Sequence, residues 1–295
     1  MSAAFEPTSR MKSVLDFMSV TLALRKLGGG PTIAAVVLAI IVIAAIFAPL
    51  YIPHDPLKID ALNRLKGSSS TFLLGTDAFG RDLFSRVVMG ARVSLFIGVG
   101  AAVVSVFLGL LIGLVSGFYR TADAIIMRIM DSLMAIPSIL LAIALVALNG
   151  PSLWSVIAAI TLPEIPRVVR LVRAVVLTAR EEPYVEAAIS LGSSMPKILW
   201  QHLMPNTLAP LTVQGTYICA SAILTEAILS FLGAGVSTEI PTWGNIMAEG
   251  RLYFQIKPAL IFWPGVMLSL CILSINLLGD TARDLLDPRL RKRET

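Results

Sequence analysis

Long stretches without a charged residue constrain this chain more than any other feature. One of them runs from Val93 to Tyr119, where 27 residues between Arg92 and Arg120 include no Asp, Glu, Lys or Arg. Crossing about 30 Å of hydrocarbon takes about 20 residues of helix, because backbone polar groups cannot stay unpaired in lipid. The chain is therefore predicted to cross a membrane as helices.

The composition supports a membrane protein and argues against a nucleic-acid partner. Hydrophobic residues make up 56% of the 295 residues and charged residues only 15%, whereas in soluble domains roughly a quarter of residues are charged. The net charge is +5, but the basic residues flank apolar runs instead of gathering on one soluble face. We therefore expect the chain to be surrounded by membrane lipid and to have no nucleic-acid partner.

Six membrane spans are predicted in an all-α, polytopic chain. The uncharged run from Ser132 to Pro163 contains Asn149-Gly150-Pro151, a turn signal that divides it into two helices. The first span is read as a retained anchor, because no cleavage site of a signal peptide follows it. The predicted spans are 32–52, 93–119, a third beginning near Asp123, a fourth continuing to about Thr178, 206–232 and 258–279.

The distribution of Lys and Arg predicts the orientation of these spans. Six spans place both termini on one side, and that side has 16 basic residues against 7 on the other, with Arg92 at a span boundary. The positive-inside rule then places both termini in the cytoplasm. The predicted organisation is a cytoplasmic segment 1–31, the first span 32–52, a periplasmic loop 53–92 with an interfacial helix, a core 93–279 of five spans that includes a cytoplasmic loop 179–206, and a cytoplasmic tail 280–295.

Glycines recur at every fourth position in the second span. Gly109, Gly113 and Gly117 form two successive G-x-x-x-G steps. Small residues at this spacing let two helices approach closely. The pattern predicts a close helix contact, either within this chain, which we favour, or at a subunit interface.

The loop 179–206 has a pattern of its own on the predicted cytoplasmic side. Pro183 suits the first turn of a helix, and Gly192 can end that helix in a left-handed conformation. A second helix is predicted from Ser193 as N-cap through Trp200, until Pro205 breaks it. The loop is therefore predicted to be helix, turn, helix.

The same loop resembles a known signature. Glu186-Ala187-Ala188, three residues, Gly192, nine residues and then His202-Leu203-Met204-Pro205 resemble the cytoplasmic loop of ABC importer permeases, with Met204 where that family usually has Leu. In that family the loop forms coupling helices that dock on ATPase subunits. The resemblance implies ATPase coupling at Glu186, Ala187, Ala188, Gly192, His202 and Pro205, the alternative being a merely structural loop.

A second segment resembles the C-type permeases of the dipeptide, oligopeptide and nickel ABC importers. It runs from Leu74 to Asp82 and continues through Ser85-Arg86. Its signature residues are Gly75, Asp77, Gly80, Arg81 and Asp82. The two glycines bracket a turn, and an amphipathic interfacial helix is predicted from Arg81 onward. A salt-bridged structural turn is favoured over contact with a substrate-binding protein.

The resemblance covers nearly the whole chain and implies a type I ABC importer permease fold in a bacterial inner membrane. One departure is the segment 162–167, where the family commonly shows aromatic residues and an Ala before the Arg and this chain has Pro163 and Pro166. The implied partners are a homologous B-type permease, two cytoplasmic ATPases and a periplasmic substrate-binding protein. Related permeases transport dipeptides, oligopeptides, glutathione and nickel. Since the chain has no G-x-x-x-x-G-K-[ST] loop, ATP and Mg are expected on the partner ATPases, with no cofactor and no enzymatic activity here.

Polar residues inside the predicted spans define the rival hypotheses. Asp131, Glu226 and Asn276 could line a pathway or form an intramembrane network, and we favour the network. An ion-coupled secondary transporter is the alternative function, but it requires charges deep in the spans. Arg167, Arg170 and Arg173 repeat every third residue, a spacing also found in voltage-sensor helices, but we disfavour that function here. No metal site is expected in the chain.

Overall fold

The computed structural model describes residues 29–286, in which the regular elements are helices. Residues 1–28 of the predicted cytoplasmic segment 1–31 and residues 287–295 of the predicted tail lie outside them. The long helices are α2 (Gly29–Tyr51), α3 (Leu83–Phe118), α4 (Arg120–Ala135), α5 (Ser138–Asn149), α6 (Leu153–Ala179), α9 (Met204–Phe231) and α11 (Ala259–Leu286). The short ones are α7 (Pro183–Ser190), α8 (Met195–Lys197), α10 (Trp243–Gly250) and a π-helical segment (Ile198–Leu203). The all-α prediction is confirmed.

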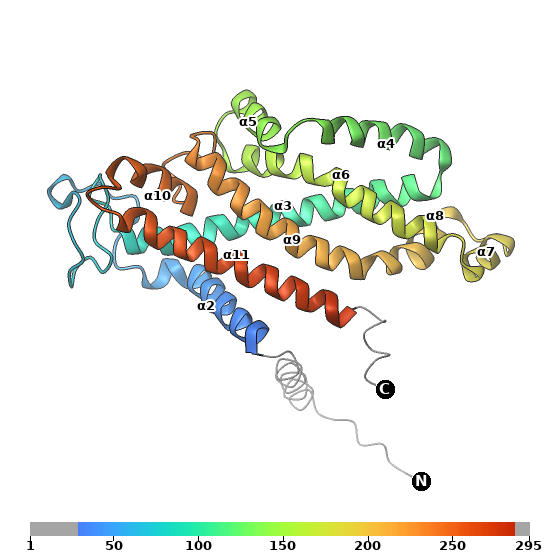
Figure 1. The fold of residues 1–295 in the computed structure, drawn as a ribbon, viewed down its shortest axis with the longest axis horizontal. Helices are drawn as coiled ribbons and strands as arrows, with labels where there is room; N and C mark the ends of the chain where they lie inside the picture. The colour runs from blue at the N-terminus through green and yellow to red at the C-terminus, as the bar shows by residue number, and fades with distance from the viewer. Residues whose placement is uncertain (1–28, 287–295) are drawn as a thin grey trace, which may run out of the picture.

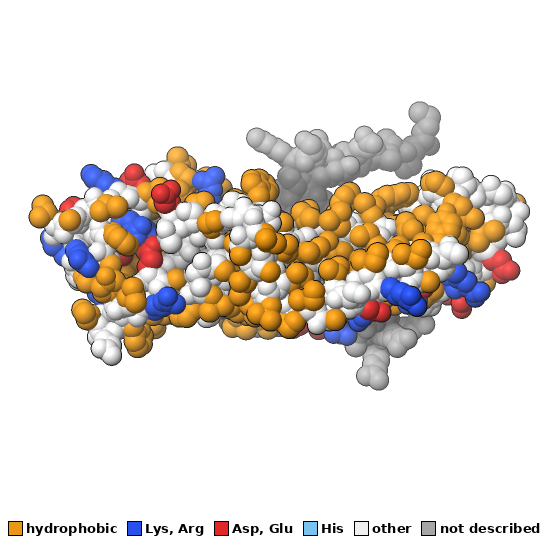
Figure 2. Space-filling model, turned by 90° about the horizontal axis from the view of Figure 1, so that it is seen from above, with side chains coloured by type: hydrophobic (Ala, Val, Ile, Leu, Met, Phe, Trp, Pro, Cys, Tyr) orange, Lys and Arg blue, Asp and Glu red, His pale blue; other side chains and the backbone are white. Residues whose placement is uncertain are grey.

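The long helices lie roughly lengthwise and give the molecule two distinct ends (Figure 1). One end, here called the α10 end, holds the segment between α2 and α3 together with α10. The other, the α7 end, holds α7 and the turn between α3 and α4. Helix α3 has its most extensive contact with α6, while α11 packs against α9 and α2. Figure 2 shows hydrophobic side chains over the middle of one face and charged side chains gathered toward both ends, as expected for a bundle inside lipid.

The helices agree with a polytopic chain, although fewer than six of them qualify as membrane spans by length and composition. Within residues 29–286, four helices are long and apolar enough to cross a membrane: α2, α3, the continuous helix Met195–Phe231, and α11. The bent pair of α4 and α5 is a fifth candidate. Helix α6 has 27 residues, about 40 Å of helix, but it includes Glu164 and several arginines. The number six is therefore approximate.

Two details of the predicted spans were wrong. No separate interfacial helix follows Arg81, because α3 begins at Leu83 and continues without a break into the apolar run. The third span is also not one helix, since α4 and α5 meet at an angle of 90°. Pro137 explains the break: a residue before proline avoids helical geometry, and Ile136 is extended with ψ of 128°.

Pro205 does not end the second helix of the loop, contrary to the prediction. The helix begins after Ser194, not Ser193, and runs through the π-helical segment into α9. The Met204 N–H donates to the carbonyl of Leu199, five residues back, so the wider turn accommodates a proline that has no N–H. Helix α11 likewise continues beyond the predicted end at Gly279, and α10 was not predicted.

The glycines of α3 make the close helix contact within the chain that was favoured. A Cβ atom added at Gly109, Gly113 or Gly117 would lie 2.4, 2.6 or 2.6 Å from a valine Cβ of α6. The valines, in the same order, are Val168, Val172 and Val176. Only glycine leaves room at these positions, and Pro163 and Pro166 do not interrupt α6 on the way to them.

Candidate coupling loop and ion cluster at the α10 end

Helix α7 has well-defined ends. Pro183 occupies its first turn, where a missing N–H costs nothing. At the other end Gly192 has φ of +75°, the Ser193 N–H donates to the Ala188 carbonyl at 3.0 Å, and the Gly192 N–H donates to the Ile189 carbonyl at 2.9 Å. These two bonds form a Schellman motif. The predicted helix end at Gly192 is confirmed.

The two faces of α7 have different surroundings. Val185 is buried in a cluster that also contains Ile198 and Leu203 of the following helix, and Ala188 is buried as well. On the outer face Glu186 and Ala187 are exposed, and the side chain of Leu191 just beyond the helix is 85% exposed. The two alanines of the signature therefore have different surroundings. Ala188 is buried on the inner face of α7, whereas Ala187 is exposed on the outer face, where its small side chain hardly protrudes.

A polar contact ties α7 to the start of α9. The side-chain amide of Asn206 donates to the Tyr184 hydroxyl at 3.0 Å and to the His202 backbone carbonyl at 2.6 Å. His202 thus acts through its backbone here, while its ring lies beside that of Tyr184 with centroids 6.3 Å apart. Beside this contact is a hollow of about 520 Å³ lined by Glu182, Tyr184, Asn206 and the end of α6. Asn206 was not among the predicted site residues.

At the α10 end, two arginines and two carboxylates form a buried ion cluster. Arg81 Nε donates to Asp77 Oδ2 at 2.7 Å, and Arg81 Nη2 donates to Glu249 Oε2 at 2.5 Å. Arg86 is fully buried and donates from Nη1 both to Asp77 and, at 2.7 Å, to Glu249 Oε2. The cluster is electrically balanced, as burial requires.

The glycines of the segment 74–82 permit this cluster to form. Gly75 and Gly80 have φ of +82° and +76°, and a Cβ at Gly80 would lie 1.8 Å from the carbonyl oxygen of Asp60. Asp82 is the N-cap of α3, where its Oδ2 accepts from the Ser85 N–H at 3.0 Å. The five signature residues therefore lie together. Glu249, which completes the cluster, was missed because it is 163 residues from Arg86 in sequence.

The three predicted intramembrane polar residues are not brought into one site. Glu226 is fully buried in α9 and accepts at Oε1 from the Ser230 hydroxyl at 2.7 Å, while its Oε2 has no hydrogen-bond partner among the described residues. Asp131 of α4 pairs with Arg170 at 2.5 Å, and Asn276 is half-buried on α11. Within residues 29–286 no hydrogen bond or ion pair joins any two of them.

Each arginine of the α6 repeat has an acidic partner. Arg167 pairs with Glu164 on the same helix at 2.7 Å. The other two arginines of the repeat pair with α4: Arg170 with Asp131, and Arg173 with Asp123. Two of the three pairs thus fasten α4 to α6, which explains the repeat as helix packing.

The fold and these sites define a polytopic membrane protein of the transport-permease class. Residues 105–292 match the family described as binding-protein-dependent transport system inner membrane component. The chain belongs to this family.

Relatives over nearly the full length agree with that assignment. The chain is 51% identical over 267 residues to a probable peptide ABC transporter permease of Sinorhizobium fredii, covering 90% of this chain and 89% of the relative. It is 44% identical over 293 residues to a putative peptide transport system permease of Brucella suis, covering 99% of both chains. It is 42% identical over 259 residues to a di/tripeptide transport system permease of Pseudomonas aeruginosa, covering 85% of this chain and 86% of the relative.

A solved structure shares the fold. An inward-facing structure of the MetNI methionine ABC transporter has a chain that aligns with a TM-score of 0.50 at 22% identity, covering 70% of this chain and 98% of that one. Together with the family match, this makes the chain a multi-pass inner-membrane permease of an ABC importer with the type I fold. The ion-coupled transporter is not supported.

Proposed function

We propose that the chain imports peptides or similar small solutes as one half of a translocation pathway. The names of the relatives, all peptide permeases, support this substrate class. The other half would be a homologous B-type permease, with two cytoplasmic ATPases that bind ATP and Mg and a periplasmic protein that delivers the substrate. In this proposal the chain itself is non-catalytic and both termini are cytoplasmic, as the charge distribution predicts.

The shape of α7 supports coupling to the ATPases more than any other observation. An exposed outer edge with Glu186, Ala187 and Leu191 stands at the end of the bundle that is predicted to be cytoplasmic (Figure 1). A helix edge with a small side chain, such as Ala187, and an acidic side chain, such as Glu186, can fit into a groove of a partner protein. Since α7 is bounded by Pro183 and a Schellman motif at Gly192, it would move as one rigid body.

The packing beneath α7 provides a route for that motion. Val185 packs in one buried cluster with Ile198 and Leu203, which lie at the start of the continuous helix Met195–Phe231. Its 37 residues extend about 55 Å, from the α7 end toward the α10 end. Closure of the ATPases would move α7, tilt this helix and favour the outward-facing state, provided that ATP-bound ATPases contact that state better. Reopening would release substrate inward.

The periplasmic signature is assigned a structural role in this proposal. Asp77 and Arg81 are buried and already paired within the chain, which leaves few of their donors and acceptors for a partner protein. The ion cluster would fix the loop 53–82 to α10. Contact with the substrate-binding protein would then come from neighbouring exposed residues.

A disulfide cross-link tests the docking directly. Leu191→Cys, with the cysteine exposed at α7, is expected to cross-link to a cysteine placed in the groove of the copurified ATPase. Leu62→Cys is the matched control, since Leu62 is 89% exposed but lies before α3, in the segment at the α10 end. A cross-link from position 62 and none from position 191 would reject the proposed docking surface.

A further inference from the structure

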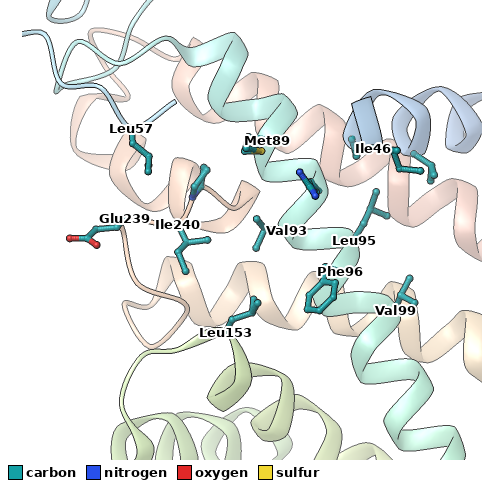
Figure 3. Close-up of a pocket in the computed structure, with 14 residues that line it drawn as sticks. Ile46, Leu57, Met89, Val93, Leu95, Phe96, Val99, Leu153, Glu239 and Ile240 are labelled. Carbon is teal, nitrogen blue, oxygen red and sulfur yellow. The ribbon is translucent and has the colours of Figure 1, made fainter. Parts of the chain in front are cut away.

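An apolar groove opens on the side of the bundle, toward the α10 end. It has a volume of about 710 Å³ and is bounded by α2, α3, the start of α6 and residues 239–241. Figure 3 shows Val93, Phe96 and Val99 along α3, with Leu153 and Ile240 on the opposite walls. Glu239 lies at the edge with its carboxylate directed away from these side chains. The groove is large enough for a flexible apolar chain and has few polar groups inside.

Arg92 is the one cation in the lining of this groove. It is exposed on α3, and in the part of the chain that the structure describes it makes no ion pair. Exposed apolar side chains continue below it on the same face of the helix, at Phe96, Val99 and Val103. The spacing of four, seven and eleven residues makes this a single stripe with a positive charge at its head.

The position of Arg92 in sequence fixes its depth in the membrane. It directly precedes the 27 uncharged residues 93–119, so it lies where hydrocarbon gives way to the polar interface. The neighbouring Trp154 is 70% exposed and meets Phe96 edge to face with ring centroids 6.1 Å apart. Exposed tryptophan is typical of this interfacial layer.

We propose that the groove binds a phospholipid of the leaflet at the α10 end, the periplasmic one in the orientation proposed above. An acyl chain would lie along Phe96 and Val99, and the phosphate would accept from the guanidinium of Arg92. A guanidinium binds phosphate in a bidentate manner, and the apolar lining matches the chain attached to it. Charge, depth and lining together fit an amphiphile with an anionic phosphate better than a free anion or a peptide.

Photolabelling in the assembled transporter tests this site. The complex would be placed in nanodiscs that contain phosphatidylethanolamine with a diazirine in one acyl chain, and labelled peptides would be identified by mass spectrometry. Label is expected on α3 around Phe96 and Val99. Arg92→Gln should lower that label by about threefold or more, and Arg120→Gln, which changes an exposed arginine at the opposite end of the bundle, should not.

A second variant tests the apolar part of the site independently of Arg92. Val99→Trp fills the groove but leaves Arg92 in place, so it should also lower the label on neighbouring α3 residues. Equal labelling of the wild type and both variants would overturn the proposal. So would a groove that takes no lipid label but forms photo-cross-links to the copurified second permease, because a protein would then occupy it. Competition by inorganic phosphate should have no effect, and a loss of label with phosphate would point to an anion site instead.

Discussion

Arg86 has the surroundings that least tolerate substitution. Its side chain is fully inaccessible and shares Asp77 and Glu249 with Arg81, so the cluster has two positive and two negative charges. Removing one partner of a buried ion pair leaves a charge without compensation, which commonly costs about 3–5 kcal/mol. The cluster is therefore expected to tolerate balanced changes better than single ones.

A double-mutant cycle tests that expectation. Arg86→Met should lower the free energy of unfolding by about 3–5 kcal/mol, because Asp77 and Glu249 would then share only Arg81. Adding Glu249→Gln should restore part of the loss, since it removes the surplus negative charge. Chemical unfolding of the purified subunit in detergent measures both. Strictly additive losses would show that the cluster does not act as a unit.

Glu226 distinguishes a structural carboxyl from one in the transport pathway. It accepts from Ser230 and is surrounded by protein, so an amide of the same shape should fit. Glu226→Gln is expected to keep substrate uptake within about twofold of the wild type, while Glu226→Ala, which leaves the Ser230 hydroxyl without its acceptor, should lower the amount of folded subunit. Loss of uptake in a fully folded Gln variant would instead assign the carboxylate to transport.

At the scale of elements, the contact between α3 and α6 depends on missing side chains. Gly113→Ala places a Cβ 2.6 Å from the Cβ of Val172 and should destabilise the subunit by about 1–3 kcal/mol. Gly100→Ala on the same helix is the control, because its Cβ would lie 3.6 Å from the nearest atom, Ile157 Cδ1. In addition, Val172→Gly should cost less in the Gly113→Ala background than in the wild type. Thermal unfolding of the wild type, the two single variants at positions 113 and 172 and the double variant would show whether the two substitutions are coupled.

The turn after α7 is the second element whose geometry can be tested. Gly192→Pro should leave the subunit in the membrane but uncouple ATP hydrolysis from uptake, because proline cannot adopt φ of +75° and removes the bond to the Ile189 carbonyl. Gly150→Pro is a matched control: Gly150 has φ of +82° and equally open surroundings, but it lies in the turn between α5 and α6. Normal uptake by the Gly192→Pro variant in vesicles would argue against coupling through this turn.

Sequence patterns predicted the elements well where one physical factor dominated. Uncharged runs placed the spans, and the glycine repeat predicted the contact with α6. Pro137 is a local signal for the bend between α4 and α5, but it was overlooked because the third span was placed from the length of an uncharged run. The helix continues past Pro205 by means of a π-helical turn, which no residue spacing predicts. The pairing of Arg86 with Glu249 depends on how distant segments meet, and no local pattern contains that information.

At the scale of the whole molecule, two well-packed ends are connected by the long continuous helix Met195–Phe231. The ion cluster fixes the α10 end, and the buried contacts of α7 join the other end to the helix Met195–Phe231. Separate ATPase subunits could move such a helix bundle through α7, whereas an ion-coupled transporter would need titratable groups along a transport pathway. The two mechanisms therefore differ in the source of energy for transport.

Reconstitution of the complete transporter distinguishes the two sources of energy. The chain, its partner permease and the ATPases would be placed in liposomes, with ATP on the ATPase side and the binding protein with a labelled dipeptide on the other. We predict that peptide crosses only when ATP is present and that ionophores which abolish ion gradients leave the rate unchanged. Transport that continues without ATP and stops when the ion gradients collapse would contradict the account.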